Sequence, residues 1–82
     1  MNAQLKNFEL RDSQVTDTGL VHLKGLTNLF SLDLYNTKTT DGGLVHLKGV
    51  TNLKVLNLMD TQVTGTGITE LKQALPELHI EK

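Results

Sequence analysis

The stretch "LFSLDLYNTKTTDGGLVHLKGVTN", residues 29–52, decides the fold, because most of it occurs again on either side. Residues 5–28 and 53–77 align with it at a spacing of 24, except that the last block is one residue longer near Gln73 and Ala74, and "GLVHLKG" is identical at 19–25 and 43–49. Such self-similarity predicts stacked repeats, in which each unit buries its apolar face against its neighbours. We therefore expect one domain over residues 1–82, with repeats at about 5–28, 29–52 and 53–77. The apolar residues recur at matching positions: Leu5/Leu29/Leu53, Phe8/Leu32/Leu56, Leu10/Leu34/Leu58, Leu20/Leu44/Ile68, Leu23/Leu47/Leu71 and Leu26/Val50/Leu75.

Two periodicities alternate within each block of 24 residues. "LDLYN" and "LNLMD" alternate apolar and polar residues, which is typical of a half-buried strand. "DGGLVHLKG" spaces its apolar residues three apart, which predicts a short helix that a glycine ends as C-cap. At the helix starts we expect a threonine or aspartate cap, from Thr16 or Asp17, Thr40 or Asp41, and Thr64. The alternation of strand and helix along the chain predicts an α/β fold with parallel strands on one face and helices on the other.

The blocks resemble the leucine-rich repeat family, whose core pattern is L-x-x-L-x-L-x-x-N/C-x-L. In the second block Leu29, Leu32, Leu34, Thr37 and Thr39 fill these positions, and the other two blocks match it. The "V-T-D-x-G-L" ending is similar to the bacterial-like variety that carries cysteine or threonine. This resemblance implies a right-handed solenoid with parallel β-strands on its concave face, short helices on its convex face, about three repeats and a C-terminal cap strand at 78–82.

Three features of the blocks concern local structure. Thr39 stands where an aliphatic residue is expected and Gly65 where the others have aspartate, so we expect weaker packing and capping there. Ser13, Thr37 and Thr61 form a column of hydroxyls after the strands. We expect them to bond the loop backbones of adjacent blocks, because buried hydroxyls need partners. A row of nucleophiles would need a base nearby, and the sequence predicts none there.

Composition bounds the function. The chain has 82 residues, a formal charge of −1 and interspersed lysines and acids, which argues against nucleic acid. It has no cysteine, so disulfides and zinc–thiolate sites are excluded. No apolar run has membrane-spanning length, and the first residues lack the apolar stretch of a signal peptide. We expect no membrane partner; the compartment stays open, with the cytoplasm favoured.

The sequence does not predict an enzyme, a metal site or a cofactor. It lacks a G-x-S-x-G elbow, a phosphate loop and an H-E-x-x-H motif. Glu9 and Asp33 are expected side by side, but an open sheet would not raise the pKa of either carboxyl. His22, His46 and Glu70 match across blocks on the expected helix face, where they would lack a pocket and an orienting second layer of residues.

The candidate binding residues leave the strands on the face away from the helices. One expected column is Asn7, Ser31, Val55 and His79, the next Glu9, Asp33, Asn57 and Glu81, and the third Arg11, Tyr35 and Met59. The resemblance implies that this concave sheet binds a partner, so we predict a non-enzymatic protein–protein interaction module with a partner of unknown identity. The predicted contact residues are Glu9, Arg11, Ser31, Asp33, Tyr35, Val55, Asn57 and Met59. Phe30 replaces a lysine of the other blocks, and either extends this patch or shields the neighbouring turn.

The two ends of the stack differ. Pro76 is expected to end the last helix, and Leu78 and Ile80 to supply a final strand. Before the first block no comparable cap is visible, so Leu5, Phe8 and Leu10 would lack a preceding layer. This edge gives two alternative functions: a structural or self-assembling element, forming homo-oligomers through that edge, or a fragment of a larger leucine-rich repeat protein.

Overall fold

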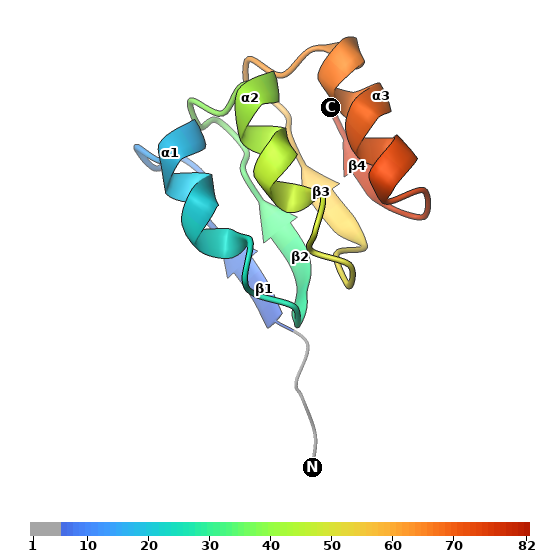
Figure 1. The fold of residues 1–82 in the computed structure, drawn as a ribbon. Helices are drawn as coiled ribbons and strands as arrows, with labels where there is room; N and C mark the ends of the chain where they lie inside the picture. The colour runs from blue at the N-terminus through green and yellow to red at the C-terminus, as the bar shows by residue number, and fades with distance from the viewer. Residues whose placement is uncertain (1–5) are drawn as a thin grey trace.

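The computed structural model describes residues 6–82, which form a four-stranded, all-parallel sheet with three short helices on one of its faces (Figure 1). The strands are β1 (Lys6–Glu9), β2 (Leu29–Asp33), β3 (Val55–Asn57) and β4 (His79–Glu81), in that order across the sheet. The helices are α1 (Asp17–Leu20), α2 (Asp41–Leu44) and α3 (Gly65–Ala74); 3-10 turns at Val21–Leu23 and Val45–Leu47 continue α1 and α2. The predicted α/β class and parallel sheet are confirmed.

The strand register follows the 24-residue period of the sequence. Ser31 pairs with Asn7 and Val55, and Val55 pairs with His79. The adjacent row, which faces the helices, contains Phe8, Leu32, Leu56 and Ile80, and the row after it contains Glu9, Asp33, Asn57 and Glu81. Because side chains alternate between the two faces of a strand, the leucines face the helices and their neighbours face away. The first two predicted columns are thus neighbours in the sheet.

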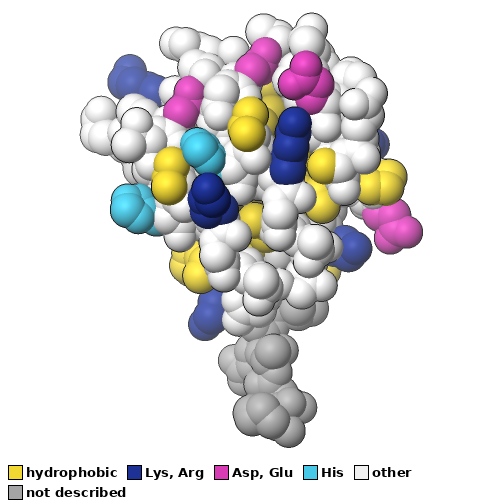
Figure 2. Space-filling model, in the orientation of Figure 1, with side chains coloured by type: hydrophobic (Ala, Val, Ile, Leu, Met, Phe, Trp, Pro, Cys, Tyr) yellow, Lys and Arg dark blue, Asp and Glu magenta, His cyan; other side chains and the backbone are white. Residues whose placement is uncertain are grey.

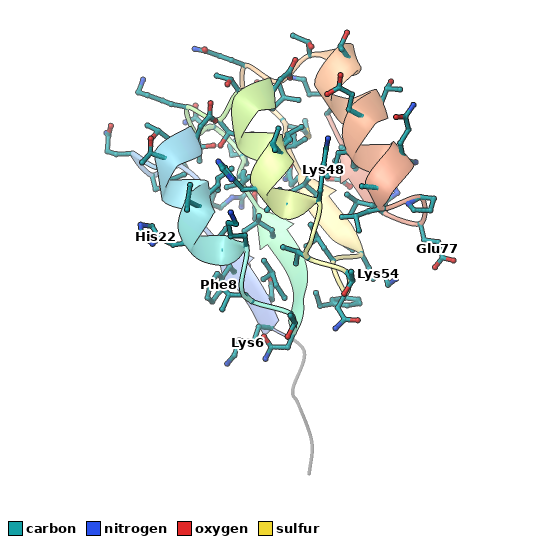
Figure 3. The ribbon with its side chains drawn as sticks, viewed as in Figure 1. Lys6, Phe8, His22, Lys48, Lys54 and Glu77 are labelled. Carbon is teal, nitrogen blue, oxygen red and sulfur yellow. The ribbon has the colours of Figure 1, made fainter. Side chains whose placement is uncertain are left out.

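The core is a stack of leucines contributed by equivalent positions of successive blocks. Buried side chains fill the space between the sheet and the helices, while Phe8, Leu10, Val15, Leu26, Ile68 and Ile80 pack against them partly buried. Figure 3 shows these side chains between the layers, with Phe8 labelled. The fully or almost fully buried hydrophobic residues are Leu20, Leu23, Leu29, Leu32, Leu34, Leu44, Leu47, Val50, Leu53, Leu56, Leu58, Val63, Leu71, Leu75 and Leu78.

The hydroxyl column bonds within each block, and our expectation of bonds to adjacent blocks is wrong. Ser13 Oγ donates to the carbonyl of Leu10 at 2.6 Å, and Thr37 and Thr61 donate to the equivalent carbonyls at 2.8 and 2.6 Å. The residue before each hydroxyl is left-handed, with φ of 60° at Asp12, 56° at Asn36 and 59° at Asp60. This conformation, which Asp and Asn tolerate, turns the chain so that the carbonyl three residues earlier meets the hydroxyl.

The two irregular positions are accommodated locally. Thr39 is completely buried, and its hydroxyl lies 3.0 Å from that of Thr37, so it is not left without a partner. Gly65 is the first residue of α3, and the aspartates at that position in α1 and α2 bond forward to the next helix. Among the described residues no helix follows α3, so the glycine removes no such bond.

The starts of α2 and α3 are each tied to the preceding helix by an aspartate. Thr40 donates its backbone N–H, at 2.7 Å, and its hydroxyl to the carboxylate of Asp17. Thr64 donates in the same way to Asp41, at 2.7 and 2.5 Å. We call these two contacts the aspartate–threonine links. Thr16, Thr40 and Thr64 are the N-caps, but only the hydroxyl of Thr40 accepts a bond from its own helix, from Gly42.

The prediction of glycine C-caps is wrong. The C-caps after the two 3-10 turns are Lys24 and Lys48, both right-handed, and no glycine among residues 6–82 has a positive φ. A tightening 3-10 turn satisfies the last carbonyls here, so no left-handed residue is needed. The prediction for the last helix agrees with the structure, since α3 ends at Ala74, just before Pro76.

Two glycines are required by the aspartate–threonine links. A Cβ at Gly43 would overlap the Asp17 carboxylate and lie 2.9 Å from Leu20 Cδ1. A Cβ at Gly67 would overlap the Asp41 carboxylate and lie 2.5 Å from its Cγ. The absence of a side chain therefore lets each aspartate approach the next helix. At Gly65, by contrast, a Cβ would enter open space.

Gly67→Ala should destabilise the fold, because the new methyl displaces Asp41 from Thr64. We expect a loss of about 1–3 kcal/mol in the free energy of unfolding, as for other overpacked sites. Gly65→Ala is the matched control in the same helix and should be neutral or stabilising by up to about 1 kcal/mol. Urea unfolding followed by circular dichroism measures both. Equal stability of the two variants would contradict the close approach at Gly67.

The second link predicts a pH dependence. Bonds from the hydroxyl and then the backbone N–H of Thr64, with a further one from the Gly67 N–H, lower the pKa of the Asp41 carboxyl below its ordinary value of 3.8. Its contribution to stability is therefore complete above the unfolded pKa and is lost as pH falls through the lower, folded pKa. The gap in urea midpoint between wild type and Asp41→Asn should shrink on acidification from about pH 6 through this range. A gap that stays constant would argue against the link.

Candidate binding face

The sheet face turned away from the helices, here called the open face, carries the predicted contact residues. Arg11, Tyr35 and Met59 lie just beyond the strand ends, where the backbone ladder continues. The N–H of Asp12 donates to the Tyr35 carbonyl at 2.9 Å, and that of Asn36 to the Met59 carbonyl at 3.0 Å. The third predicted column therefore lies beside the other two. The contact residues are thus brought together on one surface: Glu9, Arg11, Ser31, Asp33, Tyr35, Val55, Asn57 and Met59.

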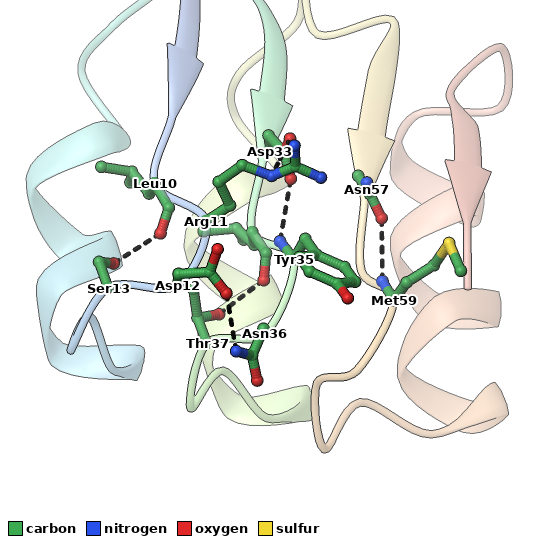
Figure 4. Close-up of polar contacts among 11 residues, drawn as sticks. Leu10, Arg11, Asp12, Ser13, Asp33, Tyr35, Asn36, Thr37, Asn57 and Met59 are labelled. Carbon is green, nitrogen blue, oxygen red and sulfur yellow. Dashed lines mark hydrogen bonds and ion pairs between the residues drawn. The ribbon is translucent and has the colours of Figure 1, made fainter.

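Three of these residues form a connected cluster, the Arg11 cluster (Figure 4). Arg11 Nε lies 3.2 Å from Asp33 Oδ2, and the Arg11 guanidinium carbon lies 4.9 Å from the centre of the Tyr35 ring. The Tyr35 N–H donates to the other oxygen, Asp33 Oδ1, at 3.0 Å. A single carboxylate thus contacts both the cation and the turn that carries the ring.

Asp33 and Asn57 also have a structural role that sequence analysis missed. Asn57 Oδ1 accepts the Met59 N–H at 3.0 Å, which repeats the bond from Tyr35 to Asp33 (Figure 4). Asp and Asn side chains commonly accept the N–H two residues ahead, and this opens a turn. The signal was present in the sequence as an Asp or Asn two residues before Tyr35 and Met59, at the end of a strand.

The apolar part of the open face is small. Met59 is 44% exposed, and Tyr35 and Val55 are half-buried beside it. Phe30 is 37% exposed at the start of β2. Five residues of extended chain separate it from Tyr35, roughly 16 Å. Phe30 therefore lies away from Tyr35 and Met59, but it adjoins Ser31, whose register partner is Val55.

The groups considered for chemistry fall into two sets, the carboxylates of Glu9 and Asp33 in the sheet and the histidines on the helix face. Glu9 and Asp33 are neighbours in register, as expected, but Asp33 is paired with Arg11. His22 and His46 lie in the 3-10 turns of the helix face, where charged and apolar side chains alternate without one large patch (Figure 2). Within residues 6–82 no three His, Asp or Glu side chains are grouped to hold a metal ion.

Two hollows in the surface of residues 6–82 are lined without any residue of the three columns. One, of about 310 Å³, lies between residues 51–54 and the turn from α3 to β4, and includes Leu53, Leu75 and Leu78. Lys54 and Glu77, labelled in Figure 3, face each other at its rim with 3.8 Å between Nζ and Oε1. The other, of about 330 Å³, follows the polar turns at Asp12, Asn36 and Asp60.

Comparisons with known proteins give no relative: no family model, no curated protein and no solved structure matches this chain. Among the described helices, none combines the length and the apolar character needed to cross a membrane.

Asp33 offers a test of the turn and the ion pair separately. Asp33→Asn keeps an oxygen for the Tyr35 N–H and removes only a half-exposed ion pair, so it should cost less than about 1 kcal/mol. Asp33→Ala leaves the Tyr35 N–H without its partner and should cost about 1–2 kcal/mol. Urea unfolding of both variants decides this. Equal losses for the asparagine and the alanine would show that the ion pair, and not the turn, is what Asp33 contributes, because both variants lack the ion pair.

Proposed function

We propose that this chain is a non-enzymatic protein–protein interaction module of the leucine-rich repeat class, which binds its partner through the open face. In this proposal the stack is a right-handed solenoid and the open face is its concave side. The sequential order of four parallel strands and the placement of all three helices on one face support it. So does the right-handedness of nearly all parallel strand–helix–strand connections.

The Arg11 cluster beside Met59 carries the functional proposal. Tyrosine and arginine are favoured at binding hot spots, and side chains that are ordered in advance lose less entropy on binding. The core positions repeat from block to block, whereas the open-face positions change from Asn7 to Ser31 to Val55 along one row. Fold stability does not fix the residue type at these positions, which leaves them free to match a partner's surface.

A protein fits this face better than a small molecule or a reaction. The two hollows described above lie away from the open-face columns, which supports a broad contact surface over a small-molecule pocket there. The hydroxyls of Ser13, Thr37 and Thr61 donate to backbone carbonyls and are not activated nucleophiles. We propose no catalytic role, cofactor, nucleic-acid partner or membrane partner.

Self-association through the β1 edge is the second candidate function. Phe8 and Leu10 remain partly buried, whereas Leu32, Leu56 and Leu58 at equivalent positions are at most 1% exposed. Another layer, from a second copy or from a longer parent chain, would complete their burial. Leu5, the third predicted edge residue, lies outside the described residues.

A double variant tests the binding proposal. Tyr35→Glu with Met59→Glu places two charges on the open face and should abolish capture of the partner from the native host while unfolding stays cooperative. Val21→Glu with Val45→Glu is the matched control, because these valines are 39% and 52% exposed on the helix face. Capture that survives the first pair, or fails equally with both, would count against binding through the open face.

A further inference from the structure

The open face has an excess of negative charge. Three carboxylates, those of Glu9, Asp33 and Glu81, share one row across the sheet, and Arg11 in the next row is the guanidinium beside them. His79 Nε2 lies 4.0 Å from Glu81 Oε2, at the outer limit for an ion pair. Charge complementarity therefore favours a cationic partner over an anionic one.

Within this row the three carboxylates are not equivalent. One oxygen of Asp33 faces Arg11 Nε and the other accepts the Tyr35 N–H, so its charge is neutralised and both oxygens are used. Glu9, its neighbour in register, is exposed. Its carboxylate has no hydrogen-bond or ion-pair partner among the described residues. Glu9 is thus the acidic group available to a partner at the Arg11 cluster.

An apolar surface lies at a suitable distance from Glu9. Tyr35 is one strand across and two residues further along, which places their Cα atoms about 8 Å apart. Side chains two residues apart on an extended segment lie on one side, separated by about 7 Å. A segment with a cationic residue and an apolar residue in that spacing would place the first on Glu9 and the second on Tyr35 and Met59.

We propose that the open face recognises an extended segment of its partner in which a lysine or arginine stands two residues from an apolar side chain, with Glu9 as the cation's counter-ion. This inference rests on the proposed function and names the chemistry of the partner. Arg11 then serves mainly to neutralise Asp33 and to hold the Tyr35 ring, since its Nε and its face are already engaged within the chain.

Three blocked pentapeptides test the proposal directly: Ser-Lys-Thr-Leu-Ser, Ser-Glu-Thr-Leu-Ser and Ser-Lys-Thr-Ser-Ser. Each is titrated to millimolar concentration into ¹⁵N-labelled protein at low salt, and amide shifts are followed by NMR. The lysine–leucine peptide should bind most tightly, shift the amides around Glu9, Tyr35 and Met59, and weaken as salt rises. Binding of the glutamate peptide at least as tight as that of the lysine–leucine peptide, shifts confined to other surfaces, or no shifts at all would overturn the proposal.

A pair of single substitutions isolates the counter-ion. Glu9→Gln should lower the affinity for the lysine–leucine peptide by about threefold, the size expected for one exposed charge pair. Glu70→Gln, the same change on the helix face, should leave its affinity unchanged. Equal affinities in the two variants would remove Glu9 from the site. If none of the peptides binds while the Tyr35/Met59 double variant still fails to capture the native partner, the proposed binding function stands. Only the proposal of a cationic segment would then be wrong.

Discussion

Burial of leucine between successive blocks is the constraint on which the rest of the structure depends. A block of 24 residues has one strand and one short helix, too little to enclose its own apolar side chains. Leu32 and Leu56 are almost completely buried because layers flank them on both sides, whereas Phe8 and Ile80, in the outer strands, are only partly buried. Register is therefore set by hydrophobic contact, and the polar bonds then fix details within it.

Those polar bonds are of two kinds, and each acts over a different range. Within a block, the side chain of Asp33 or Asn57 accepts the N–H bond at the beginning of the turn after the strand. A hydroxyl such as that of Thr37 donates the bond at the end of the same turn. Between blocks, the aspartate–threonine links join one helix start to the next, and Gly43 and Gly67 leave room for them. These turns position the open-face residues Tyr35 and Met59, because the backbone N–H of each donates to the last residue of its strand, Asp33 or Asn57.

Periodicity predicted most of the fold, because leucines that recur every 24 residues can be buried together only if the blocks stack in phase. It predicted the parallel strands, the helix face, the first two columns and the helix starts, although it left open whether Thr40 or Asp41 is the cap. It could not predict the left-handed backbone at Asp12, Asn36 and Asp60. Nor could it predict that the Asp17 side chain bonds to the next block, because the spacing of residues along the chain does not show where a side chain points. For the same reason Asp33 was predicted only as a surface contact, although its carboxylate is the centre of the Arg11 cluster.

The aspartate–threonine links give the stack a polarity. The central block carries both halves, a donor in Thr40 and an acceptor in Asp41, whereas block one supplies the acceptor Asp17 and block three the donor Thr64. Residues 29–52 are therefore a self-compatible module: a tandem duplicate spliced in at that point would meet matching halves at both junctions. Lengthening beyond α3 would instead break the series at Gly65. The interior of this scaffold is thus the place where an engineer could widen the open face one strand at a time.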